Sequence, residues 1–285
     1  MNLYHKLRWN DMLVRDAINM DAVTIALVLL GSGCIGFLFA PLGLGGGLLF
    51  APLLHYGLGW EIDGALLIVS LGLSATVAWG SGLRHRKEGH VSDERFKQSL
   101  VGALPGAILG VVLVASLSGS FDLIFKTLSL IFVSWAIVKT LRSKNHQLDG
   151  QREPALIPLR GGVASGGLLS SVLAIGAGAI YVPVLRAYGG LESRKAIGTS
   201  LHIMMVVLPI SILTHFVALD SSQVDVLSSN LVLILSLPIV VVVAANLGAR
   251  FGIAKVSEQH IMRLFVAVLC VIGIRYVIDL SSRLF

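Results

Sequence analysis

The stretches Gly43-Leu44-Gly45-Gly46-Gly47 and Ala174-Ile175-Gly176-Ala177-Gly178 each interrupt a long apolar run of the chain. Each is followed five residues later by a proline, Pro52 or Pro183. An offset of 131 residues relates the two stretches, and it also pairs Gly36 with Gly167, Leu54 with Leu185, Gly59 with Gly190, Glu61 with Glu192 and Ala65 with Ala196. Unwound backbone at membrane depth persists only where it lines a cavity, and matched breaks in two halves of a chain are typical of secondary transporters. The sequence therefore predicts a membrane protein built from two repeats.

The composition of the 285-residue chain also indicates a membrane protein. Hydrophobic residues make up 55% of it and charged residues 13%, and the mean hydropathy is +0.85. Several apolar runs exceed the roughly 18 residues that separate a spanning helix from a buried core helix, which excludes a soluble domain. The basic isoelectric point does not indicate a nucleic-acid partner, because the Lys and Arg residues lie between apolar runs without interleaved aromatics. Cys34 and Cys270 lie within apolar runs, and the sequence indicates no disulfide, metal site or cofactor.

The apolar runs divide the chain into segments. We expect an interfacial amphipathic segment at 1–20, a first membrane repeat at 21–141, a cytoplasmic linker at 142–160 and a second membrane repeat at 161–285. Spanning helices are expected at 22–40, 62–83, 98–117, 121–141, 161–174, 197–219, 227–248 and 261–278.

Two shorter apolar pieces, 48–57 and 179–189, follow the glycine stretches. Each reaches only about half of a bilayer core of about 30 Å. Each piece therefore either crosses where the membrane is pinched or returns as the second arm of a hairpin with the helix before it. The expected fold class is all-α, with broken helices of two inverted repeats meeting near the midplane of the lipid bilayer.

The distribution of charge predicts the orientation of the chain. Basic residues gather in segments 84–97, 139–160, 186–195 and 250–263, whereas the opposite connections carry Glu61, Asp63, Asp122, Asp220 and Asp225. The positive-inside rule places the basic segments in the cytoplasm and both termini outside a bacterial inner membrane. Segment 84–97 is then inside while its counterpart around residues 220–225 is outside, so the two repeats run in opposite senses.

The glycine stretches are the expected binding site for a substrate. Where a chain unwinds and restarts as a helix, the first amides lack partners and carry the positive end of the helix dipole, which favours an anion. Gly45, Gly46 and Gly47 precede one such half-helix, and Gly176, Ala177 and Gly178 precede the other. In opposed repeats the two N-termini would converge. The alternative is that these glycines only allow close helix packing. Replacing Gly46 by Leu is expected to abolish transport and preserve the fold.

These residues resemble the sulfite exporter TauE/SafE family of membrane proteins. The resemblance covers about residues 22–280 and rests on Gly-x-Gly-Gly-Gly-x4-Pro, the weaker Gly-x-Gly-x4-Pro, Ala196-Ile197-Gly198-Thr199-Ser200 and Glu88-Gly89-His90-Val91. It implies a transporter of sulfite, organosulfonates or related sulfur compounds, with export favoured. Ala177 departs from the pattern of the first repeat, where Gly46 stands.

Polar residues within the spans are further substrate-binding candidates. Ser70, Ser74 and Thr76 lie on the helix after the first break, and Thr199, Ser200 and His202 begin the helix after the second. Hydroxyl groups suit an oxyanion because they donate hydrogen bonds without a fixed charge. Each of them alternatively bonds back to its own helix. We expect His202 rather than His55 or His215 to be the functional histidine, because ionisable groups at membrane depth are rarely incidental.

The predicted function is that of a permease for a small sulfur-containing anion, working by alternating access, with no enzymatic activity. We expect no Asp, Glu, Lys or Arg deep in a span, so binding should be weak and based on the backbone. A passive anion channel is the main alternative. An intramembrane serine hydrolase is a third, but Ser200 and His202 point about 200° apart on a helix. The exact substrate, the coupling ion and the oligomeric state stay open.

Overall fold

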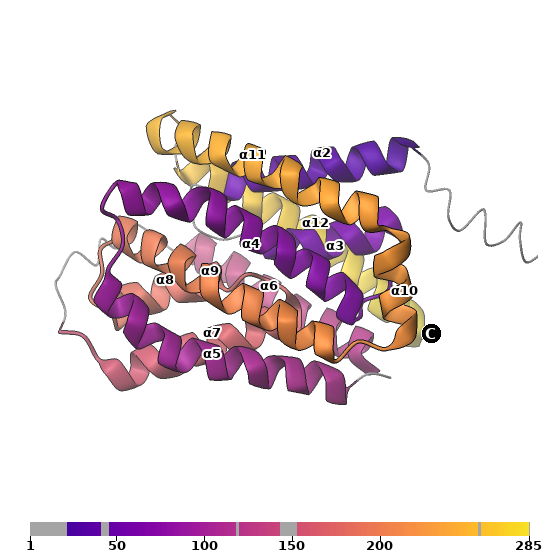
Figure 1. Cartoon of the computed structure of the whole chain (residues 1–285), viewed down its shortest axis with the longest axis horizontal. Helices are drawn as coiled ribbons and strands as arrows, with labels where there is room; N and C mark the ends of the chain where they lie inside the picture. Colours follow the sequence, from indigo (N-terminus) through magenta and orange to yellow (C-terminus); the bar gives the residue numbers. More distant parts are fainter. Residues whose placement is uncertain (1–21, 41–45, 118–119, 143–152, 256–257, 285) are drawn as a thin grey trace, which may run out of the picture.

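The computed structural model describes residues 22–40, 46–117, 120–142, 153–255 and 258–284 (Figure 1). In these residues the regular structure is helical, and the helices are α2 (Ala22–Phe39), α3 (Gly47–Leu58), α4 (Gly64–Lys87), α5 (Asp93–Ser116), α6 (Phe121–Arg142), α7 (Leu156–Leu173), α8 (Gly178–Ala187), α9 (Ser193–Val217), α10 (Ser221–Ser229), α11 (Leu231–Lys255) and α12 (Glu258–Leu284). Seven of the described helices are long and apolar enough to cross a membrane, namely α2, α4, α5, α6, α7, α9 and α11. The expected all-α membrane fold is confirmed.

The expected helices are present with shifted ends, except that the chain over 227–248 is divided in two. The short helix α10 precedes α11 because Asp220 begins it with a capping box, in which its side chain accepts from the Gln223 amide. The Gln223 side chain in turn accepts from the Asp220 amide. A capping box satisfies two otherwise unpartnered amides, so it starts a helix even in a polar connection.

The two short helices are the second arms of hairpins. A Cβ added at Gly57 of α3 would lie 2.9 Å from Val28 of α2, and one at Gly31 of α2 would lie 3.2 Å from Leu53 of α3, so the two helices run antiparallel. In the second half, a Cβ added at Gly162 of α7 would lie 2.8 Å from Val184 of α8, and these two helices also run antiparallel. Of the two possibilities open from the sequence, the structure has the hairpin, and each short helix returns to the end where the preceding helix began.

Helices α4 and α9 correspond under the 131-residue offset and pack against each other in the middle of the molecule (Figure 1). Gly64 at the start of α4 faces Leu219 just beyond the end of α9, and Gly82 near the end of α4 faces Leu201 near the start of α9. Corresponding helices therefore run in opposite directions. This arrangement supports the expected inverted repeats.

One long helix of each half packs against the first helix of the other half. Helix α5 lies along α7, with Gly106 against the carbonyl oxygen of Ala164, and α11 lies along α2, with Gly248 against the carbonyl oxygen of Phe37. Glycine at these positions lets the two backbones touch, which is a common basis for helix association in membranes.

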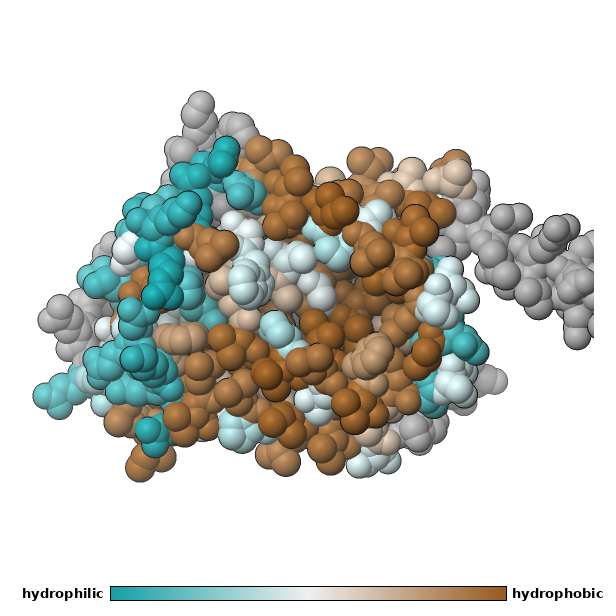
Figure 2. All heavy atoms as spheres, viewed as in Figure 1, coloured by the Kyte–Doolittle hydropathy of each residue, from teal (hydrophilic) through white to brown (hydrophobic). Residues whose placement is uncertain are grey.

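The surface separates into two hydrophilic ends and an apolar band between them (Figure 2). Arg84, Arg86 and Lys87 end α4 at one end of the molecule, where the α4–α5 connection lies. Glu61, Asp63 and Asp220 lie together at the opposite end, at the rim of a shared cavity. The separation of charge that was used to orient the sequence is therefore a separation in space.

Candidate functional site

The two half-helices α3 and α8 begin at corresponding residues with the same backbone geometry. Gly46 and Ala177, which immediately precede them, both adopt left-handed conformations, with φ of 69° and 55°. Neither half-helix has a side-chain cap at its start. The amides of Leu49 and Ile180 already donate to the carbonyl oxygens of Gly46 and Ala177, so only the first two amides of each half-helix lie before the first intrahelical hydrogen bond. An Ala at a positive φ is strained, which indicates that the surrounding structure holds Ala177 in this geometry.

The two breaks meet in the interior. A Cβ added at Gly47 would lie against the carbonyl oxygen of Ala174 and 2.5 Å from the carbonyl carbon of Ile175, so the backbones of the two breaks are in contact. The same Cβ would lie 2.6 Å from Oγ of Ser74, and a Cβ at Gly176 would lie 3.6 Å from that atom. Ser74 of α4 therefore lies between the two breaks, although they are far apart in sequence.

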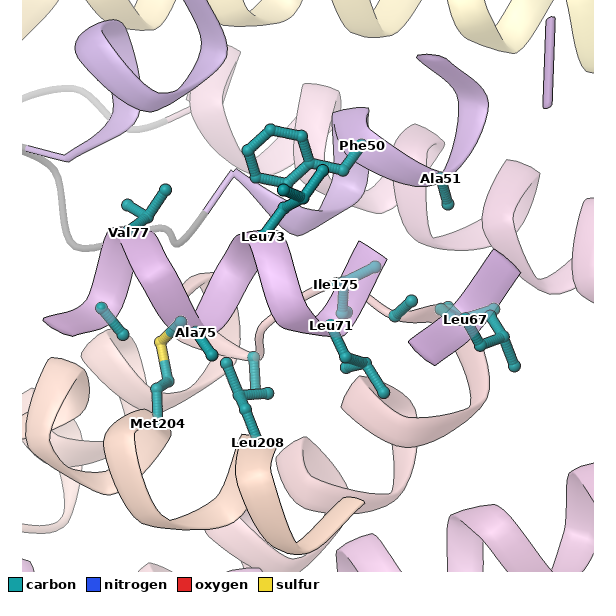
Figure 3. Close-up of a cluster of buried hydrophobic side chains, with 14 of the residues drawn as sticks. Phe50, Ala51, Leu67, Leu71, Leu73, Ala75, Val77, Ile175, Met204 and Leu208 are labelled. Carbon is teal, nitrogen blue, oxygen red and sulfur yellow. The ribbon is translucent and has the colours of Figure 1, made fainter. Parts of the chain in front are cut away.

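The surroundings of this contact are apolar. Figure 3 shows Phe50 and Ala51 of α3, Leu71 and Leu73 of α4 and Ile175 of the second break gathered around α4. Met204 and Leu208 approach from α9 on the other side. All of these side chains are buried. An ion that reaches this region is surrounded by low-dielectric material, in which backbone amides and hydroxyls interact with charge more strongly than they do in water.

Two serines of α4 supply the polar side chains at the breaks. Ser70 donates a hydrogen bond to the carbonyl oxygen of Ala174 at 3.4 Å, and Ser74 donates to the carbonyl oxygen of Ser70 at 3.0 Å. Both residues are fully buried. Thr76, like Ser74, bonds back within its own helix, to Leu73 at 2.7 Å, but it is Ser74 that lies next to Gly47 and Gly176. Of the three hydroxyls on this helix, Ser70 and Ser74 are therefore the ones placed at the breaks.

The candidates on α9 lie in different surroundings. Thr199 accepts a hydrogen bond at 3.0 Å from the amide of Ser92 and so holds the start of α5. Nδ1 of His202 lies 3.0 Å from the carbonyl oxygen of Gly198, and its ring meets Phe96 edge-on. Ser200 is fully buried and its hydroxyl has no hydrogen-bond partner, so it does not pair with His202. Gly45, the remaining candidate, lies outside the described residues.

The space at the first break is small. A cavity of about 10 Å³, lined by Gly46, Leu48 and Ile175 among others, lies beside it. That is about the space that one water molecule needs. A Cβ added at Gly46 would lie 2.7 Å from Ile35 and 3.1 Å from the ring of Phe50. A side chain at position 46 combines a positive φ with this close approach, so we expect Gly46→Leu to strain the fold as well as the site.

A second cavity, of about 490 Å³, opens at the acidic end of the molecule. We call it the acidic vestibule. It is lined by the carboxylates of Glu61, Asp63, Asp122 and Asp220 and by His55 and His215. Partial burial raises the pKa of Asp63 against the effect of two amide hydrogen bonds, whereas the Ser222 hydroxyl holds the pKa of Asp220 below its usual range.

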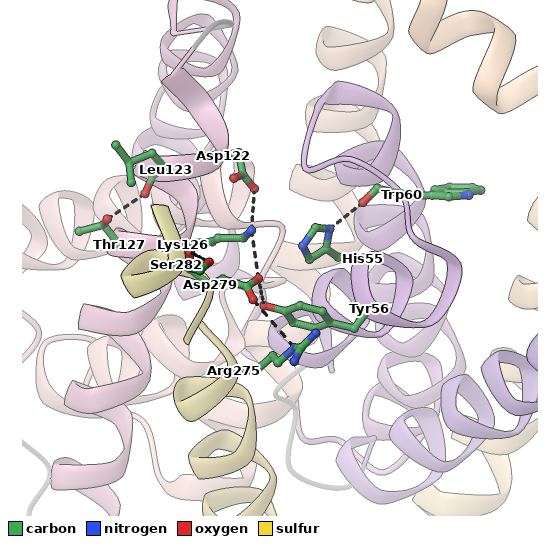
Figure 4. Close-up of polar contacts among 10 residues, drawn as sticks. All are labelled: His55, Tyr56, Trp60, Asp122, Leu123, Lys126, Thr127, Arg275, Asp279 and Ser282. Atoms are coloured by element: carbon green, nitrogen blue, oxygen red, sulfur yellow. Dashed lines mark hydrogen bonds and ion pairs between the residues drawn. The ribbon is translucent and has the colours of Figure 1, made fainter. Parts of the chain in front are cut away.

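Beside the acidic vestibule lies a charge cluster that the sequence reasoning missed. Nζ of Lys126 in α6 is 3.2 Å from Asp122 in the same helix and 3.2 Å from Asp279 in α12, and its side chain is only 4% exposed (Figure 4). The Tyr56 hydroxyl of α3 donates to Asp279 at 2.9 Å. The sequence reasoning expected no charged residue deep in a span and did not single out Lys126, which is buried near the end of one. It lies little more than one turn from the start of α6, where its two carboxylates compensate the charge.

Seven helices that can span a membrane, together with two uncapped half-helices that meet in the interior, define a multi-pass membrane protein of the broken-helix type. A family model described as sulfite exporter TauE/SafE matches residues 28–276. The chain therefore belongs to the TauE/SafE family, as its resemblance implied, and is a membrane transporter.

A curated relative from Haemophilus influenzae carries the description "Probable membrane transporter protein". It is 30% identical to this chain over 184 residues, which cover 62% of this chain and 67% of the relative. No solved structure matches the chain.

Proposed function

We propose that this protein is a secondary transporter that carries a small sulfur-containing anion, such as sulfite or an organosulfonate, across the bacterial inner membrane. Transport proceeds by alternating access between two inverted repeats, and the family description favours export. The observation that carries the proposal is the contact between the two breaks, where Gly47 meets Ala174 and Ile175 beside Ser74.

The proposed site binds the anion with backbone amides and hydroxyls. The first amides of α3 and α8 point into the site, and each of the two helices adds the positive end of its dipole, which favours a negative ligand. Ser70 and Ser74 bring hydroxyls that would turn from their present acceptors, the carbonyl oxygens of Ala174 and Ser70, to donate to the anion. Ser200 is a further candidate because its buried hydroxyl is unpartnered. Because these groups carry no full charge, they hold an anion without trapping it, which a transporter needs.

Access to this site requires the breaks to separate. A cavity of about 10 Å³ holds no ion as large as sulfite, so this conformation is closed around the site. We infer that movement of one hairpin, α2–α3 or α7–α8, relative to α4 and α9 opens the site to each side in turn. The contact between breaks is then broken and reformed in every transport cycle.

Counterflow of labelled sulfite in liposomes containing the purified protein tests the function. We expect saturable exchange of labelled sulfite, and unlabelled sulfite and small sulfonates should inhibit it by competition. The zwitterion taurine should compete poorly, because its ammonium group meets the positive ends of both half-helices at a cost on the order of 1 kcal/mol.

The same liposomes distinguish the alternatives. A passive anion channel would give a non-saturating current and no counterflow. Cleavage of a peptide or ester substrate would favour a hydrolase. Taurine uptake that matches sulfite uptake would contradict the proposed site.

A further inference from the structure

We infer that the acidic vestibule is the release mouth of the transport path, so that the protein binds its anion more weakly from that side than from the basic end. This inference rests on the proposed anion transport and names the side at which the anion leaves. Three features carry it: the position of the cavity relative to the breaks, the charge of its lining, and the opposite charge at the other end of the molecule.

The acidic vestibule extends toward the two breaks. His55, in its lining, is eight residues along α3 from Gly47, which corresponds to about 12 Å of helix. His215, also in the lining, lies with Nε2 3.0 Å from the carbonyl oxygen of Ser171, three residues before the second break at Ala174. The floor of the cavity thus touches elements that lead directly to both half-sites. An anion released between the breaks toward this end passes through the vestibule.

The lining of the vestibule repels an anion. Among the described residues it contains four carboxylates and no Lys or Arg. The charge of Asp122 is compensated by Lys126 behind it at 3.2 Å. The carboxylates of Glu61, Asp63 and Asp220 therefore determine the electrostatic potential at the opening of the acidic vestibule. Clefts lined by one sign of charge with low-dielectric walls change the local concentration of ions severalfold.

The opposite end of the molecule attracts an anion. Arg84 and Arg86 of α4 are compensated there by Glu88 at 3.0 Å and Asp93 at 3.5 Å. Lys87 at the end of α4 and Arg194 and Lys195 at the start of α9 supply the excess positive charge. Glu192, the counterpart of Glu61 under the 131-residue offset, also lies at this basic end and is exposed. Anions therefore accumulate at one end and are depleted at the other. This asymmetry supplies no energy, but it raises the KM on the vestibule side and slows the return of released substrate.

The size of the effect follows from distance. Asp63 is separated from Ser74 by about 17 Å of helix. In water, one charge at that distance weakens the binding of a monovalent anion by about 1.5-fold, and three weaken it by about 3.5-fold. Screening removes most of this effect at physiological salt, where the Debye length is about 8 Å, and somewhat less than half of it at 0.01 M, where the Debye length is about 30 Å. The asymmetry should therefore be largest at low ionic strength.

The test replaces these three charges and measures sulfite transport from each face. The variant carries Glu61→Gln, Asp63→Asn and Asp220→Asn, in which Asn keeps both helix caps because it caps as well as Asp. The matched control is Glu192→Gln, the same change at the symmetric position of the basic end. KM for sulfite is measured in right-side-out and inside-out vesicles at about 0.01 M and about 0.15 M ionic strength. Labelling of a cysteine introduced at Ala115, which lines the vestibule, identifies the face that carries it.

We expect the triple variant to lower KM about twofold at low salt on the vestibule face only, and the control to leave that KM unchanged. An unchanged KM on the vestibule face, or an equal fall on both faces, overturns the inference while leaving the proposed function intact. If the wild-type protein moves no sulfite into either kind of vesicle, the proposed function fails and the release mouth fails with it.

Discussion

Replacing Lys126 by Met should destabilise the protein, because two partly buried carboxylates, 25% and 20% exposed, would lose their shared cation. Nζ lies 3.2 Å from Asp122 and 3.2 Å from Asp279, and the side chain is 4% exposed. Removing one partner of a buried ion pair costs about 3–5 kcal/mol. We expect a value near the lower limit, about 3 kcal/mol, because Asp279 keeps the hydrogen bond from Tyr56.

Thermal unfolding of the purified protein in detergent, followed by intrinsic fluorescence, measures this effect. A loss of about 3 kcal/mol lowers the midpoint by roughly 6–12 °C for a chain of this size. Combining Lys126→Met with Asp279→Asn should cost less than the sum of the two single changes, because the pair is then removed together. Thr127→Val, which removes a hydroxyl that bonds only to its own helix at Leu123, is the control and should change little. A midpoint within about 2 °C of wild type for Lys126→Met would refute the reasoning.

Three further predictions concern packing, orientation and His202. Gly106→Ala should lower the unfolding midpoint because its Cβ meets the carbonyl oxygen of Ala164, at a cost of about 1–3 kcal/mol. The control Gly161→Ala, where nothing lies within 4 Å of the added Cβ, should be neutral or stabilising. Equal effects of the two changes on the midpoint would exclude close contact between α5 and α7. Cysteines introduced at Lys87 and Ser222 should react with an impermeant thiol reagent from opposite sides of the membrane, Lys87 from the cytoplasm; labelling from one side would end the inverted-repeat proposal. His202→Gln should retain sulfite binding, because an amide can replace Nδ1 in its hydrogen bond to Gly198; complete loss of binding would make His202 a ligand.

The membrane fold, the half-helices and the family could be predicted from the sequence, because each depends on local patterns. Runs of glycine determine where a helix breaks, and the length of an apolar run determines whether it can span the membrane. The two half-helices begin at Gly47 and Gly178, each one residue before the expected position. The hairpins were only one of two possibilities, since the direction of a short helix depends on packing partners such as Val28 and Val184.

The details of the candidate site depended on contacts that sequence spacing does not contain. Ser74 lies between the breaks because α4 passes both of them. Thr76, two residues further along α4, donates its hydroxyl to the carbonyl oxygen of Leu73. Thr199 carries the family pattern and yet bonds to the amide of Ser92 across the connection before α5. Lys126 was missed because its partner Asp279 is distant in the chain, and only the pairing of α6 with α12 makes its burial tolerable. Asp122, one helical turn before Lys126, was the one local signal of this cluster.

The central claim is that the two breaks together bind the anion, and the affinity of the purified protein for sulfite tests it most directly. Ser74→Ala removes the hydroxyl that lies between the breaks, and Thr76→Val removes one that bonds only to its own helix two residues away. Since a hydrogen bond to a charged group contributes about 1.5–3 kcal/mol, Ser74→Ala should weaken sulfite binding by about tenfold or more, and Thr76→Val should leave it unchanged. Wild-type affinity in a folded Ser74→Ala protein, or equal weakening in both variants, would contradict the account.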